Sequence, residues 1–168
     1  MLKTNWQSKQ IWILIMLLVV VFDQYTKILS SHYLDFHQFI AIVPGVKLML
    51  AHNYGAAWSF LANQTGWQRW FLAGVAVLMS GILSVWIYKT RVTAVAEGIS
   101  LSLILGGALG NLIDRLIFGY VIDFISLYYK AWHWPTFNIA DAAITVGGVM
   151  LAIEVLKKKE ETQEAVGI

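Results

Sequence analysis

Four long apolar stretches dominate the chain, and polar or turn-forming segments separate them. They cover residues 11–31, 70–88, 95–113 and 137–156. A bilayer core about 30 Å thick is crossed by roughly 20 helical residues, so each stretch is long enough to span it. A helix also satisfies its own backbone hydrogen bonds, as a lipid environment requires. The pattern predicts an all-α integral membrane protein with four transmembrane helices, in a single polytopic domain over residues 1–168.

The segments between the spans have different patterns. Residues 43–50 read Val-Pro-Gly-Val-Lys-Leu-Met-Leu, and a proline–glycine turn before an alternating run favours short strands over helix. The loop over 114–136 is rich in tyrosine and tryptophan, which favour the boundary between headgroups and water. The tail 157–168 is strongly charged and is expected to fray.

Basic residues gather on one side of the expected membrane. Seven of the twelve precede the first span, lie between the second and third, or follow the fourth: Lys3, Lys9, Lys89, Arg91 and Lys157 to Lys159. Only four lie in the loops 32–69 and 114–136. Because lysine and arginine favour the cytoplasmic side, both termini and the tail 157–168 are expected in the cytoplasm. The two long loops are then expected at the periplasmic face of a bacterial inner membrane.

Composition supports a membrane environment and excludes several classes of function. The chain is 58% hydrophobic and only 13% charged, whereas soluble domains carry about a quarter charged residues. A net charge of +2 without a basic stripe indicates no nucleic-acid partner. The absence of cysteine excludes disulfides and thiolate nucleophiles. The four histidines lack zinc-binding spacing, so neither a metal nor another cofactor is expected.

Ionisable side chains near the ends of the spans need a reason, because each costs at least about 2.5–3.5 kcal/mol in hydrocarbon. Asp23 and Lys27 lie four residues apart, on one face of the first span, as a potential ion pair. Such a pair either anchors the end of the helix or shapes a site, and the sequence leaves both open.

The third span ends in a second polar group. Asn111, Asp114 and Arg115 fall on one helix face, just beyond Gly106 and Gly110. Small residues four apart allow another helix backbone to approach closely. The alternative is an interfacial salt bridge, which contributes little where water reaches it.

The fourth span opens with Asn138, followed three residues later by Asp141. This spacing suits a helix N-cap with an acid that reaches back to it, so Asp141 taken alone is a capping residue. Asp141, Thr145, Gly148 and Ala152 also form a polar-to-small stripe. We expect that stripe to face protein rather than lipid.

Asp123 is harder to explain as a structural residue, because aliphatic and aromatic residues surround it in the chain. Amide hydrolysis without a metal, serine or cysteine can use two carboxylates that share one proton. Asp123 and Asp141 both lie on the outer side, where a helix N-terminus favours the ionised form of Asp141 and apolar neighbours favour the neutral form of Asp123. Two alternatives remain. One is an ion-transporting subunit with Asp23, Asp114 and Asp141 as a relay, and the other is a non-catalytic assembly protein.

Five segments, in order along the chain, resemble the motifs of the lipoprotein signal peptidase (signal peptidase II) family of bacterial inner-membrane aspartic peptidases. They are Phe22–Lys27, Asn53–Ser59, Gly106–Arg115, Val121–Phe124 and Phe137–Asp141. Trp58 stands where the family usually has phenylalanine.

The resemblance implies a membrane aspartic endopeptidase that removes the signal peptide from diacylglyceryl-modified prolipoproteins, N-terminal to the lipidated cysteine. It implies a small extracytoplasmic β-cradle, a short periplasmic helix, contact with membrane lipid and no cofactor, and we expect a monomer. Asp123 and Asp141 correspond to the catalytic dyad. Site support or substrate contact falls on Asp23, Lys27, Asn53, Gly55, Asn111, Asp114, Arg115 and Asn138.

Overall fold

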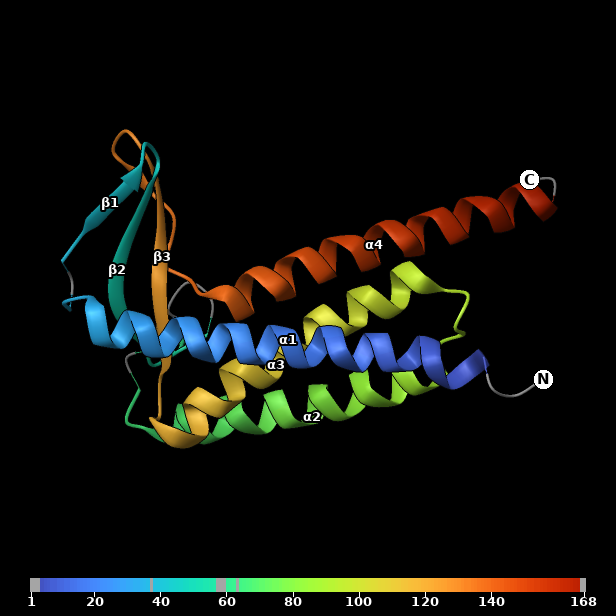
Figure 1. Cartoon of the computed structure of the whole chain (residues 1–168), viewed down its shortest axis with the longest axis horizontal. Coiled ribbons are helices and arrows are strands. Elements are labelled where there is room, and N and C mark those ends of the chain that lie inside the picture. Colours follow the sequence, from blue (N-terminus) through green and yellow to red (C-terminus); the bar gives the residue numbers. More distant parts are fainter. Residues whose placement is uncertain (1–3, 37, 57–59, 63, 167–168) are drawn as a thin grey trace.

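The computed structural model describes residues 4–36, 38–56, 60–62 and 64–166. Its elements, in chain order, are α1 (Thr4–Tyr33), β1 (Ile40–Val43), β2 (Val46–Asn53), α2 (Trp67–Lys89), α3 (Val95–Ile117), β3 (Val121–Tyr129), β4 (Trp132–His133) and α4 (Ile139–Val166). The helices form an elongated bundle with the sheet at one end (Figure 1). Both chain termini lie at the opposite end.

The four expected transmembrane helices are confirmed as helices long and apolar enough to cross a membrane: Lys9–Tyr33, Trp67–Lys89, Val95–Ile117 and Ile139–Lys158. Beyond that last segment α4 continues as a helix to Val166, whereas the expectation that residues 157–168 fray stays a prediction. Lysine and glutamate are good helix formers, and Lys158 forms a salt bridge with Glu97 of α3.

α3 is the central helix, because α1, α2 and α4 all pack against it. Glycines permit the close approach. A Cβ atom at Gly106 would lie 2.9 Å from the carbonyl oxygen of Met16 in α1, and one at Gly107 would lie 2.3 Å from that of Ala140 in α4. At Gly110 the Cβ would lie 2.5 Å from Oδ2 of Asp23. The predicted small-residue packing at Gly106 and Gly110 is confirmed.

The face of α4 that packs on α3 differs from the predicted stripe. A Cβ at Gly147 would lie 2.7 Å from the carbonyl oxygen of Ser100, whereas one at Gly148 would meet nothing within 4 Å. Gly148 and Ala152 are exposed. The prediction is wrong because the buried face follows Ala140 and Gly147, seven residues apart, and so lies one residue away from the face that Asp141 marks.

The sheet is antiparallel, in the order β1-β2-β3-β4. The predicted strands around the turn at residues 44–45 are confirmed as the β1–β2 hairpin, and Gly45 there has the positive φ of 89° that favours glycine. β3 was not expected as a strand. It pairs with β2 on one side, and Ile125 bridges to Phe137 on the other. Between β2 and α2 the described residues form turns and bends. Residues 57–59, including Trp58, lie outside the description, so the short periplasmic helix stays a prediction.

Candidate active site

A cavity of about 1020 Å³ lies where the sheet meets the ends of α3 and α4. Its lining includes the polar residues Asn53, Asn111, Arg115, Asp123 and Asp141. These side chains come from β2, α3, β3 and α4, so segments up to 88 residues apart in the chain meet at one surface. Both candidate catalytic aspartates therefore face the same space.

Asp123 enters the site from the first half of β3 and is almost fully buried, at 2% exposure. Its Oδ1 accepts a hydrogen bond of 2.7 Å from Nδ2 of Asn138. Burial raises the pKa of Asp123 to about 7, and the negative charge of Asp141 adds to the rise, while hydrogen bonds from Asn53 and Asn138 oppose it. This carboxyl group therefore holds its proton close to neutral pH.

Asp141 occupies the third position of α4 and confirms the predicted helix cap. Its backbone N–H donates to Oδ1 of Asn138 at 2.9 Å, and the backbone N–H of Asn138 donates to Oδ2 of Asp141 at 3.3 Å. The other carboxylate oxygen, Oδ1, accepts a 2.7 Å hydrogen bond from Nδ2 of Asn111. Asp141 is thus a capping residue and a lining residue of the cavity at once.

Two asparagine amides join the carboxylates. Asn138 is fully buried, and its Nδ2, besides reaching Asp123, lies 3.1 Å from Oδ1 of Asn111. Asp123, Asn138, Asn111 and Asp141 therefore form one continuous hydrogen-bonded chain. Because each amide donates to a carboxylate oxygen, the pair is held in a fixed geometry before substrate arrives.

A buried ionic cluster holds the Asn111 amide on the side opposite Asp141. Nζ of Lys27 lies 2.8 Å from Asp23 and 2.9 Å from Asp114, and all three side chains are at most 2% exposed. The predicted Asp23–Lys27 pair is confirmed and gains a third member. Lys27 also donates to Oδ1 of Asn111 at 2.9 Å. Since the amide oxygen faces the cation, the amide nitrogen faces Asp141.

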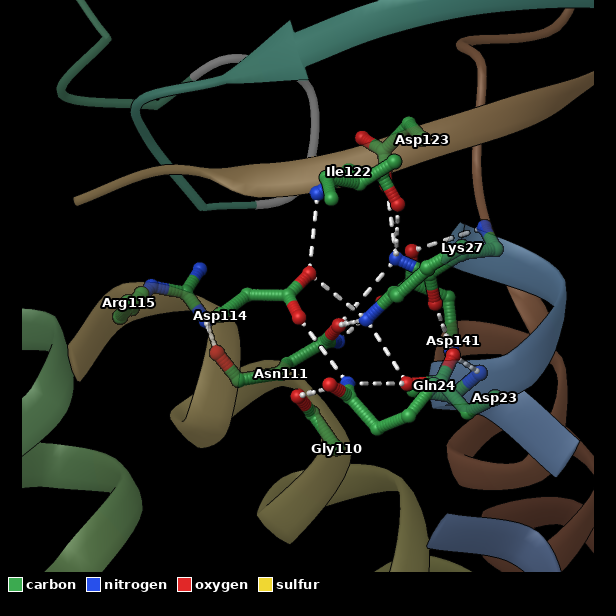
Figure 2. A network of polar contacts seen from close by, with 12 residues as sticks. Asp23, Gln24, Lys27, Gly110, Asn111, Asp114, Arg115, Ile122, Asp123 and Asp141 are labelled. Carbon is green, nitrogen blue, oxygen red and sulfur yellow. Dashed lines mark hydrogen bonds and ion pairs between the residues drawn. The ribbon is translucent and has the colours of Figure 1, made fainter. Parts of the chain in front are cut away.

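The two acids of this cluster also hold the backbone next to each candidate catalytic aspartate. Oδ2 of Asp114 accepts the N–H of Ile122 at 3.0 Å, one residue before Asp123. Oδ1 of Asp23 accepts the N–H of Ala140 at 2.8 Å, one residue before Asp141. The cluster therefore positions β3 and α4 relative to α1 and α3 (Figure 2).

Sequence reasoning missed two residues of the site. Nε2 of Gln24 lies within hydrogen-bonding distance of Asp23 and Asp114, at 3.2 and 2.9 Å. The sequence carried a signal for Gln24, because this amide directly follows Asp23 within an otherwise apolar helix. Arg69 donates to the carbonyl oxygens of Arg115 and Leu116 at 2.7 Å each, which caps the end of α3.

The remaining predicted residues surround the cavity. Arg115 donates to the carbonyl oxygen of Gly55 at 2.9 Å, and the N–H of Gly55 donates to Oδ1 of Asn53 at 3.0 Å. Asn53, Asn111 and Arg115 line the cavity. The other predicted supporting residues belong to the surrounding network without lining it. In the described part of the chain, no three His, Cys, Asp or Glu side chains are grouped as metal ligands.

A buried carboxyl group, that of Asp123, and a half-buried one, that of Asp141, line one cavity at one end of four helices suited to a bilayer, an arrangement that suits a membrane aspartic peptidase. The family model described as Signal peptidase (SPase) II matches residues 15–157. The chain is 44% identical over 158 residues to the lipoprotein signal peptidase of Pseudomonas aeruginosa, covering 93% of this chain and 94% of that protein. It is 45% identical over 144 residues to that of Acinetobacter baumannii, covering 86% and 82%.

A solved structure, described as a bacterial membrane enzyme determined by the in meso method at 2.3 Å resolution, superposes with a TM-score of 0.82 at 30% identity. The match covers 90% of this chain and 91% of that one. The chain belongs to the signal peptidase II family. It is therefore a multi-pass membrane peptidase, and nothing in the comparisons supports the ion-transporting alternative.

Proposed function

We propose that Asp123 and Asp141 are the catalytic dyad with which this peptidase removes the signal peptide from diacylglyceryl-modified prolipoproteins, N-terminal to the lipidated cysteine. The observation that carries the proposal is the shared cavity, in which both carboxylates are joined through the amides of Asn138 and Asn111. Neighbouring carboxylates resist double ionisation and so hold one proton between them.

In this mechanism Asp123 carries the proton and Asp141 is ionised. Asp141 takes a proton from water while the water oxygen attacks the scissile carbonyl carbon, and Asp123 donates its proton to the carbonyl oxygen. The tetrahedral diol then collapses. The C–N bond breaks, the departing amine takes the proton from Asp141, and Asp123 recovers its proton from the diol hydroxyl. The pKa of Asp123, raised to about 7 by burial, suits the acid role at neutral pH.

Substrate is proposed to enter from the lipid, because the cavity continues along α4 past Ile144, Thr145 and Val146. Each methylene of an acyl chain buried in the bilayer contributes about 0.8 kcal/mol, so a diacylated substrate stays at the membrane. Asn53 and Arg115 line the cavity with donors suited to peptide carbonyl groups.

The supporting roles follow from the contacts. The ionic cluster of Asp23, Lys27 and Asp114 orients the Asn111 amide and the backbone before each aspartate of the dyad. Asn138 donates a hydrogen bond to Asp123 and caps α4. The carbonyl oxygen of Gly55 accepts a hydrogen bond from Arg115. The chain is proposed to act as a monomer in a single polytopic domain, without a nucleic-acid partner. Both termini lie away from the sheet (Figure 1). Together with the basic residues at that end, this supports cytoplasmic termini and a periplasmic site in the inner membrane.

The test compares Asp123→Asn and Asp141→Asn with Asp35→Asn. Asp35 is an exposed acid just after the C-terminal end of α1, so its substitution is a matched control. Purified variants in detergent are assayed on a diacylglyceryl prolipoprotein and on the same protein without lipid. We expect both dyad variants to lose at least about 100-fold in rate, Asp35→Asn to retain full activity, and only the lipidated substrate to be cleaved. Full activity in either dyad variant would refute the proposal.

A further inference from the structure

A second cavity, of about 550 Å³, lies toward the end of the bundle opposite the proposed dyad. Residues of α1 and α2 line it, together with Leu105 of α3. It exists because α1 and α2 each pack against α3 but make few contacts with each other. Trp12, only 1% exposed, closes its inner side against α3, where a Cβ at Gly98 would lie 2.0 Å from the indole ring.

The polarity of this groove changes with depth. At its mouth, Nζ of Lys9 donates to the carbonyl oxygen of Tyr88 and lies 5.2 Å from the centroid of that ring. An ammonium group has three donors, so the contact with Tyr88 leaves Lys9 further capacity to bind an anion. α1 and α2 run antiparallel (Figure 1), and four residues along each helix from this contact, about 6 Å deeper, lie Ile13 and Ser84.

Beyond the mouth the groove is apolar in character. The hydroxyl group of Ser84 donates to the carbonyl oxygen of Ser80 at 2.7 Å, so its proton is already used within α2. Met16, Ile87 and Leu105 supply aliphatic surface. The groove thus combines one cation at the mouth with an apolar slot below it, and its size falls within the range of about 300–1,000 Å³ typical of ligand sites.

The charges around the mouth favour an anionic occupant. Lys89 and Arg91 are exposed at the same end of the bundle and add positive charge. Glu97, an acid of α3 near this end of the bundle, is compensated, because its carboxylate forms a salt bridge with Lys158 and accepts a hydrogen bond from the indole N–H of Trp86. α1 and α2 are long and apolar enough to cross a membrane, so a groove between them is exposed to lipid rather than to free solutes.

We propose that this groove is a binding site for an anionic glycerophospholipid, with the phosphate on Lys9 and one acyl chain in the slot between α1 and α2. The site lies in the leaflet around the chain termini, so the leaflet of the dyad is the opposite one. Occupancy does not depend on the catalytic assignment.

The test uses the full chain in lipid nanodiscs that contain equal amounts of phosphatidylglycerol and phosphatidylcholine with identical acyl chains. After transfer to mild detergent, native mass spectrometry measures the ratio of the two lipids that remain bound. Lys9→Gln removes the proposed phosphate contact. Lys89→Gln removes the same charge at the same end of the bundle outside the groove, and Ser84→Trp fills the slot.

We expect wild type and Lys89→Gln to retain phosphatidylglycerol preferentially, and Lys9→Gln to lower the ratio about fivefold, which corresponds to one basic residue at an anionic lipid. Ser84→Trp should reduce retention of both lipids. Equal ratios in Lys9→Gln and Lys89→Gln, or undiminished retention in Ser84→Trp, would overturn the proposal. Prolipoprotein cleavage by each variant verifies folding.

Discussion

The hydrogen bond from Asn138 to Asp123 makes a specific prediction about the pH dependence of cleavage. The amide donates to the charged form of the carboxyl group, so it lowers the pKa of Asp123 from what burial alone would produce. Asn138→Ser keeps a good helix cap but removes this donor. The neutral form of the carboxyl group then becomes more stable relative to the charged form, so the pKa of Asp123 rises above about 7.

The size of the effect follows from the bond. A hydrogen bond to a charged group contributes about 1.5–3 kcal/mol, and about 1.4 kcal/mol corresponds to one pKa unit. If the active dyad holds one proton, loss of that proton from Asp123 sets the alkaline limb of the profile of kcat/KM against pH. We expect that limb to move upward by about one to two pH units in Asn138→Ser, while the maximal rate falls because the carboxyl group is held less firmly.

Asn138→Asp provides the matched comparison. It also keeps the cap and removes the donor, but it adds a negative charge beside Asp123, so its alkaline limb should lie higher still. The assay is cleavage of lipidated prolipoprotein by the three purified proteins between pH 5 and pH 9 or above. An alkaline limb at the same pH in all three proteins would show that Asn138 acts only as a cap and would refute this reasoning.

Three further predictions concern stability. Asp123→Asn should raise the melting temperature in detergent at pH 8 but not at pH 4. The pKa of the Asp123 carboxyl group is raised from 3.8 to about 7, so the native carboxyl group destabilises the fold increasingly between those pH values, and asparagine removes that cost. Equal shifts of the melting temperature at both pH values would contradict this. Lys27→Met leaves Asp23 and Asp114 buried without a counter-charge and should cost about 3–5 kcal/mol, read from thermal unfolding; an unchanged midpoint argues against it. Gly107→Ala should lower both stability and cleavage, because its Cβ would lie 2.3 Å from a carbonyl oxygen of α4, whereas the control Gly148→Ala meets open space and should be neutral or slightly stabilising.

Hydropathy predicted the helices, because lipid leaves a strong signal in the sequence. The full set of supporting residues came from the resemblance to the family's motifs. The extent of α3 was harder to read. Polar side chains such as Asp114 and Arg115 mark the end of an apolar stretch, yet the helix continues through them to Ile117. The face of α4 was misplaced for a related reason: Asp141 points to a cavity rather than to the packing surface, so it did not mark the buried face.

The hydrogen-bond network of the site could not be predicted from the sequence. Two of its important donors are the backbone N–H groups of Ile122 and Ala140, and every residue except proline carries such a group. β3 has the β-branched and aromatic residues of a strand, but its pairing partners in β2 lie between 68 (Asn53 to Val121) and 81 (Val46 to Leu127) residues earlier in the chain. Only the folded chain reveals that pairing.

The pairing of β3 also determines where the chain tolerates a change of length. The strand is hydrogen-bonded to β2 on one side and bridged to Phe137 on the other. A slip by one residue would turn every side chain of the strand to the opposite face. An insertion between α3 and β3, next to Gly119, would therefore remove the Asp123 carboxyl group from the cavity if it shifted the strand, whereas one at the distal turn near Lys130 would leave that group in place. In this fold the number of residues in a short connection is as important as their identity.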